Sequence, residues 1–124
     1  MDLIIGGAYQ GKLLYAKRSY GLTDAEIFFC KDAHIDFRFR CIYGIEEFVY
    51  ACVTRGDDPI AVFQAQLDAW RGSILICRDI FCGVVPLSAN ERAWREQTGW
   101  LCQYLATEAA HITRIYCGLE ERLK

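Results

Sequence analysis

A glycine-rich segment near the start of the chain ends in a lysine and has the spacing of a phosphate-binding loop. Such glycines leave backbone N–H groups free to surround phosphate oxygens, and the lysine reaches the β- and γ-phosphates of a nucleotide. The pattern G-x-x-x-x-G-K is followed by Gly6, Gly7, Ala8, Tyr9, Gln10, Gly11, Lys12 and Leu13. Leu13 stands where the pattern has the Ser or Thr hydroxyl that holds Mg²⁺. A glycine-rich turn with a solvated lysine is the alternative interpretation of the same residues.

The phosphate-binding interpretation requires a strand before the loop and a helix after it. The apolar run Leu3-Ile4-Ile5 predicts a buried strand that leads into the glycines. Residues 11–20 suit a helix, and Gly21 is a natural stop for it. Both required elements are therefore expected.

Strand and helix patterns continue to alternate along the chain. Helical periodicity covers residues 45–53, a second helix starts at Asp58-Pro59 and ends at Gly72, and a capping box at Ser88–Glu91 opens a long helix with Trp94, Thr98, Leu101 and Leu105 on one face. Further strands are expected at residues 27–30, 37–41, 74–77 and 112–117. The alternation predicts an α/β fold with a mostly parallel sheet of five strands.

Composition limits the class of protein. The 124 residues predict one domain, 1–124, and 53% hydrophobic residues with two prolines favour a compact globule over disorder. A net charge of −2 gives no basic surface for a nucleic acid or an anionic membrane, so neither is expected as a partner. No apolar run approaches the roughly 18 residues that cross a bilayer, and the first residues lack a signal-peptide pattern. We therefore expect a cytoplasmic protein.

The chain has seven cysteines, an odd number. They contain no C-x-x-C pair, and the two histidines are far apart, so the spacing does not favour a zinc site. Most of the cysteines lie inside apolar runs, as Cys30, Cys77 and Cys117 do. We interpret them as small buried side chains in a reducing compartment.

Two segments of the C-terminal half give the chain a family resemblance. Ile74–Pro86 reads I-L-I-C-R-D-I-F-C-G-V-V-P, and Cys117–Lys124 ends the chain with a glycine and basic residues. With the Gly6–Leu13 loop before them, these motifs resemble the bifunctional adenosylcobinamide kinase/adenosylcobinamide-phosphate guanylyltransferases of cobalamin biosynthesis. In that family the loop reads GGxxSGKS and a later strand ends in N-E-V-G-x-G-I-V-P. The resemblance covers residues 3–20 and 74–124.

The resemblance implies a fold, ligands and an assembly. The fold would be a P-loop NTPase-like three-layer domain. The nucleotide would be ATP or GTP, the acceptor a corrinoid (cobinamide), and the protein a homo-oligomer. Lys12 would steady the phosphates. Asp79 falls on the glutamate of N-E-V-G and would approach Mg²⁺ or a phosphate-bound water; a turn carboxylate that caps nearby N–H groups is the equal alternative for Asp79.

The chain departs from the family pattern between the second and third strands. The segment that carries the guanylyl-accepting histidine is reduced to Lys31–Asp36. His34 and Arg38 keep an H-x-x-x-R spacing without the flanking residues of the family, and a solvated loop histidine is the favoured interpretation of His34. If residues 37–41 form the third strand, Arg40 replaces the acid that helps to place Mg²⁺, and a guanidinium repels a cation.

These comparisons predict a retained phosphate cradle beside a degraded metal site. We expect a short cobinamide kinase-like phosphotransferase with Lys12 and Asp79 at its centre, from which guanylyl transfer is lost. The alternative is a non-catalytic subunit that binds a nucleotide or corrinoid and regulates or assists a partner.

Overall fold

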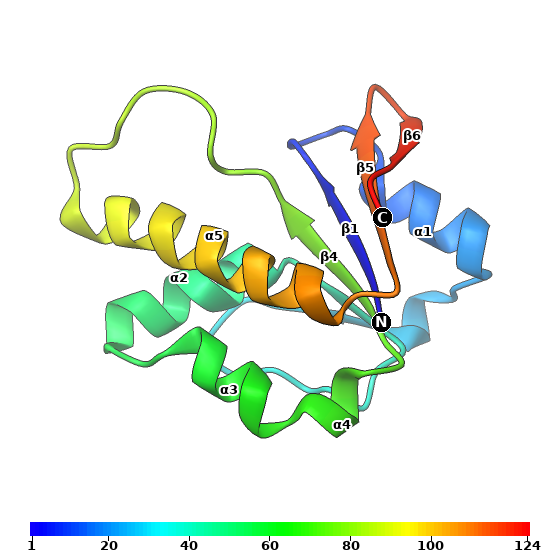
Figure 1. Ribbon diagram of the computed structural model, residues 1–124, viewed down its shortest axis with the longest axis horizontal. Helices are drawn as coiled ribbons and strands as arrows, with labels where there is room; N and C mark the ends of the chain where they lie inside the picture. Colours follow the sequence, from blue (N-terminus) through cyan, green and yellow to red (C-terminus); the bar gives the residue numbers. More distant parts are fainter.

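A six-stranded sheet forms the middle layer of the chain in a computed structural model that describes residues 1–124 (Figure 1). Neighbouring strands are parallel, except that the last two are antiparallel. Their spatial order is β2-β3-β4-β1-β5-β6. In chain order, the strands are β1 (Asp2–Gly6), β2 (Ile27–Phe29), β3 (Cys41–Tyr43), β4 (Ile74–Arg78), β5 (His111–Tyr116) and β6 (Leu119–Arg122). The α/β class and the mostly parallel sheet are thus confirmed.

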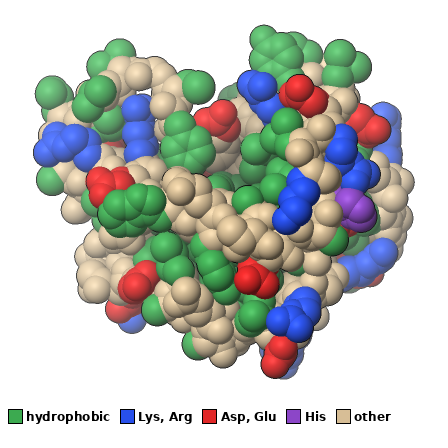
Figure 2. Space-filling view, viewed as in Figure 1, with side chains coloured by type: hydrophobic (Ala, Val, Ile, Leu, Met, Phe, Trp, Pro, Cys, Tyr) green, Lys and Arg blue, Asp and Glu red, His purple; other side chains and the backbone are tan.

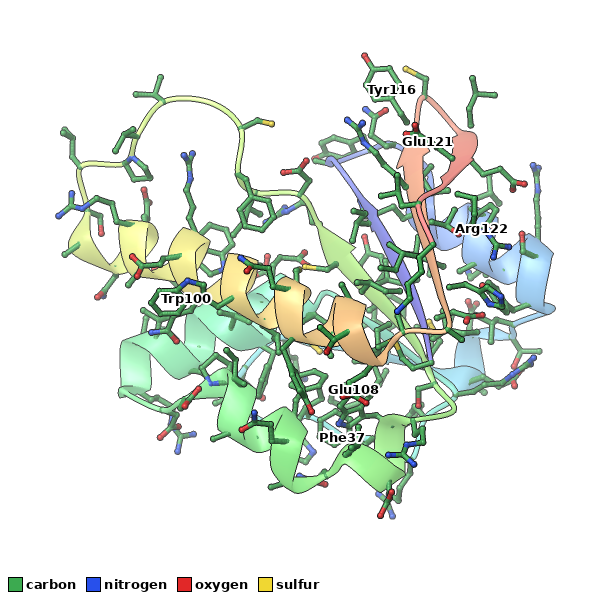
Figure 3. The ribbon with its side chains drawn as sticks, in the orientation of Figure 1. Phe37, Trp100, Glu108, Tyr116, Glu121 and Arg122 are labelled. Atoms are coloured by element: carbon green, nitrogen blue, oxygen red, sulfur yellow. The ribbon has the colours of Figure 1, made fainter.

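The expected number of five strands is wrong. After β5 the chain turns back at Cys117 and Gly118, which both have positive φ, as a tight hairpin turn requires. Its last residues then pair with β5, so that Tyr116 lies opposite Leu119. Figure 3 shows Tyr116 near the tip of this hairpin.

Helices cover both faces of the sheet. They are α1 (Lys12–Tyr20), α2 (Ile45–Arg55), α3 (Pro59–Ala65), α4 (Leu67–Trp70) and α5 (Ala89–Glu108), and a 3₁₀ turn spans Asp24–Glu26. The helix expected between Asp58 and Gly72 is two helices, because the backbone leaves helical geometry at Gln66. None of the helices has the length and apolar character that crossing a membrane requires.

The buried side chains form two clusters, one on each face of the sheet. In β1, Leu3 packs toward α2–α5, whereas Ile4 packs toward α1, because side chains alternate along a strand. The chain leaves β1 through α1 and leaves the adjacent β4 through α5, so the two connections diverge to opposite faces (Figure 1). Such a divergence opens a crevice at the carboxyl ends of the two strands, where open α/β sheets bind ligands.

The third strand lies later in the chain than the sequence predicts. Residues 37–40 are turns and bends, and β3 begins at Cys41, where pairing with Ile27 of β2 starts. The alternation that predicted a strand is real, since Phe37 is buried and Arg38 is exposed. Phe37, however, belongs to a loop that does not pair in the sheet. Its ring packs edge-on against Phe63 of α3, with ring centroids 5.1 Å apart (Figure 3).

The expectation that the cysteines are buried is confirmed for some of them and wrong for others. The structure contains no disulfide, and the buried cysteines are Cys30, Cys41, Cys52 and Cys77. Cys102 is half-buried, whereas Cys82 and Cys117 are exposed.

Candidate functional site

A cavity of about 350 Å³ opens at the carboxyl ends of the parallel strands. The segment Ala8–Leu14, which joins β1 to α1, forms one wall. The opposite wall comes from the ends of β2, β3 and β4 and the start of α2, with Phe29, Cys30, Tyr43, Gly44, Glu46, Glu47 and Arg78. The glycine loop therefore borders the largest polar hollow at this edge of the sheet.

Lys12 is the first residue of α1 and lies inside the wall of the cavity. Only 5% of the residue is exposed, so the alternative of a solvated lysine is wrong. Its Nζ donates a hydrogen bond to the carbonyl oxygen of Gly7 at 2.6 Å. Burial lowers the pKa of Lys12, and the negative charge of Glu46 opposes that shift. A buried ammonium at a helix N-terminus is well placed to attract an anion.

The loop is held in shape by close backbone contacts. A side chain on Gly6 would collide with the carbonyl oxygen of Ile115 in β5. Gly11 caps α1 with φ 94°, a left-handed conformation that glycine adopts without strain. Gln10 ties the loop to the hairpin, because its Oε1 accepts a hydrogen bond from the N–H of Cys117 and its carbonyl accepts one from Gly118.

Arg78 links β4 to the acidic start of α2. Its backbone N–H donates to Oε2 of Glu46 at 2.9 Å, and its Nε lies 3.7 Å from Oε1 of the same carboxylate. Its Nη2 donates to Oε1 of Glu47 at 3.1 Å. The backbone of Glu46 is held by α5 as well, since the indole N–H of Trp94 donates to its carbonyl oxygen at 2.7 Å. The cavity therefore carries two cations, Lys12 and Arg78, and two acids.

Asp79 lies beside the glycine loop but points into a turn. Its N–H donates to the carbonyl of Gly6 at 2.8 Å, and its Oδ1 accepts a hydrogen bond from the N–H of Phe81 at 3.0 Å. This capping bond is the one that the turn interpretation predicts. Asp79 also borders a smaller cavity of about 90 Å³ together with Arg78, Cys102 and other residues, and Lys12 does not line this cavity. Its role toward a metal or a phosphate-bound water stays a prediction.

In the free protein the acids around the loop are engaged by protein groups. Mg²⁺ in nucleotide sites is held by carboxylate or hydroxyl oxygens together with phosphates. Leu13 supplies no oxygen, Glu46 and Glu47 both face Arg78, and Asp79 caps a turn. No group of three or more His, Cys, Asp or Glu side chains is arranged to hold a metal. The cation that these carboxylates already hold is the guanidinium of Arg78.

Two further residues of the sequence prediction are Arg40, expected in place of the third-strand acid, and His34, the candidate guanylyl acceptor. Arg40 precedes β3 and lies at the amino end of the sheet. There its Nη2 donates to the carbonyl of Tyr20 and its Nη1 to Glu26. The expectation that Arg40 lies in the metal site is therefore wrong. His34 is exposed in the loop between β2 and β3, with its ring edge-on to Phe28 at 5.9 Å.

Glu46, Glu47 and Arg78 border the cavity but are not among the residues that the sequence patterns indicate. Correct placement of β3 would have found the two acids, because they follow its carboxyl end by three and four residues. Arg78 is the last residue of β4 and pairs in register with Gly6. Its place beside the first glycine of the loop becomes visible only once the register between β1 and β4 is known.

No protein-family model and no curated protein matches this chain.

Proposed function

We propose that the chain binds ATP or GTP through Gly6–Leu13, as a kinase-like protein of corrinoid salvage with a P-loop NTPase-like fold. The observation that carries the proposal is Lys12, a lysine only 5% exposed that starts α1 and borders a cavity at the carboxyl ends of the parallel strands. The loop N–H groups and the Lys12 ammonium would hold the phosphates.

The corrinoid part of the proposal rests on the family resemblance and on an apolar surface. Large exposed apolar side chains occupy the loop after β4, at Phe81, Val84, Val85 and Leu87, and the β5–β6 hairpin, at Tyr116 and Leu119. Figure 2 shows apolar groups on both projections, with a hollow between them. Cobinamide, whose ring is broad and partly apolar, would bind between them. Its phosphoryl-accepting hydroxyl would then be directed to the γ-phosphate.

Calorimetry with ATP and GTP tests the nucleotide part. We expect binding by the wild type, and a ten- to hundredfold loss in Lys12→Ala, since one charge-assisted phosphate contact contributes about 1.5–3 kcal/mol. Lys17→Ala is the matched control, because Lys17 lies in the last turn of the same helix and pairs with Asp24. Absence of binding by the wild type at millimolar nucleotide would reject the proposal.

A non-catalytic binding subunit is the second candidate function. The observation that favours it is the replacement of the hydroxyl by Leu13, together with the pairing of Glu46 and Glu47 with Arg78. Incubation with ATP or GTP and cobinamide separates the candidates: formation of cobinamide phosphate indicates the kinase, and tight nucleotide binding without product indicates the binding subunit.

We expect no guanylyl transfer in either case. His34 is solvent-exposed in a short loop and lacks the flanking residues of the family. Incubation with radiolabelled GTP should therefore leave no acid-labile label on the chain. Labelling that disappears in His34→Asn would contradict this expectation.

A further inference from the structure

We infer that Arg78 is a second phosphate-binding cation of this site and that Glu47 is its exchangeable partner, which a bound phosphate displaces. The inference rests on the proposed nucleotide binding, and it assigns to a side chain of this protein the charge neutralisation that a metal ion supplies in other phosphate sites.

The position of Arg78 is fixed by the sheet. Arg78 ends β4 directly opposite Gly6, the first glycine of the loop, and its side chain borders the same cavity as Lys12. The buried carboxylate of Glu46, only 6% exposed, holds the backbone N–H of Arg78 and lies close to its Nε. The guanidinium is therefore directed along the cavity wall, where a bound phosphate chain would pass.

The one hydrogen bond of the guanidinium within the protein is the bond that its Nη2 donates to Glu47, a partner far more exposed than Glu46. The Arg78 side chain is 35% exposed, its Nη1 makes no hydrogen bond within the protein, and its Nη2 contacts only Glu47. The Glu47 side chain is 46% exposed. Exposed ion pairs contribute little to stability, so exchange of this carboxylate for a phosphate costs little. A guanidinium also offers phosphate two parallel N–H donors, a geometry that it forms with particular strength.

The charges in the cavity explain why such an exchange is needed. In the free protein Lys12 and Arg78 are balanced by Glu46 and Glu47. A phosphate chain that binds to Lys12 alone would meet both carboxylates, whereas movement of Glu47 into solvent leaves Arg78 to face the phosphate. The partly exposed Glu47 thus competes with the ligand for Arg78, and the buried Glu46 keeps Arg78 in place.

Affinities for ATP and GTP, measured by calorimetry with Mg²⁺ and with EDTA, test the inference. We expect Arg78→Met to bind ten- to a hundredfold more weakly, Arg78→Lys to recover part of the loss, and Glu47→Gln to bind about three- to tenfold more tightly. Removal of Mg²⁺ should change the wild-type affinity by less than about tenfold. Arg40→Met is the matched control, because it removes the same charge at the opposite end of the sheet.

The outcomes separate this inference from the proposed function. If Lys12→Ala weakens binding and Arg78→Met does not, the role of Arg78 is rejected and nucleotide binding stands. If the wild type binds neither nucleotide, the proposed function fails. Circular dichroism checks that each variant is folded. Where Arg78→Met does not fold, Arg78→Lys and Glu47→Gln decide, and unchanged affinity in both overturns the inference.

Discussion

The side-chain oxygen of Gln10 accepts a hydrogen bond from the backbone N–H of Cys117 at 2.6 Å, which connects the glycine loop to the β5–β6 hairpin across 107 residues of sequence. The carbonyl of Gln10 accepts a second bond from Gly118 at 3.0 Å. The hairpin, which the sequence interpretation did not include, thus braces the loop from the side opposite the cavity.

Removal of this brace should weaken both the fold and the site. In Gln10→Ala the side-chain hydrogen bond is lost, so we expect the free energy of unfolding to fall by about 1 kcal/mol. Nucleotide affinity should fall by about fivefold, because more of the loop's ordering entropy is then lost on binding. Urea titration and calorimetry measure the two effects. Gln103→Ala, an exposed position on α5, is the control. Equal behaviour of the two variants would contradict the bracing role.

Gly6 should be intolerant of the smallest side chain. Because the added Cβ of Gly6→Ala meets the carbonyl oxygen of Ile115, the loop or β5 must move, and such overpacking typically costs about 1–3 kcal/mol. Gly72→Ala is a matched control, since a Cβ added at Gly72 would meet no atom within 4 Å and the backbone there has ordinary φ. Thermal unfolding should separate the two variants by several degrees. Similar melting temperatures would show that β5 yields without cost.

Trp94 should stabilise the acidic wall of the site from α5. Its indole N–H donates to the carbonyl of Glu46, and its ring packs edge-on against Tyr50 with centroids 5.3 Å apart. Trp94→Phe keeps most of the ring contact and removes the donor, so we expect a loss of about 1 kcal/mol in unfolding free energy. Trp100→Phe on the same helix is the control, because Trp100 is half exposed and its indole N–H makes no hydrogen bond within the protein. A loss of equal size in Trp100→Phe would exclude a specific role for the Trp94 hydrogen bond.

Local patterns in the sequence predicted the elements that carry strong signals. The β1–loop–α1 unit follows from an apolar run, glycines and a helix stop at Gly21, and β4 follows from four consecutive apolar residues. All of these signals lie within a few residues of the element that they specify, so no tertiary information was needed.

The elements that depend on pairing partners were missed. The segment 37–41 alternates as a strand does, but pairing with β2 begins only at Cys41, and register is not visible in a single segment. The exposed charged strand β6 has no apolar face to reveal it. The Arg78–Glu46 pair joins residues 32 positions apart, and it could be inferred only once β3 and β4 were known to be neighbours.

The ionisation of Lys12 should make the stability of the free protein depend on pH in a specific direction. Burial lowers the pKa of Lys12 in the folded state below its ordinary 10.5, so the unfolded chain binds more protons in the interval between the two pKa values. Stability therefore rises with pH across that interval, as the folded protein loses a charge that burial penalises.

Lys12→Met has no such group. We expect the difference in unfolding free energy, wild type minus Lys12→Met, to increase from pH 7 toward pH 10.5, as measured by urea titration at each pH. Nucleotide should reverse the trend, because phosphate stabilises the charged ammonium and binding weakens as Lys12 loses its proton. A difference that stays constant with pH would mean that the ammonium is as well solvated in the fold as in the unfolded chain.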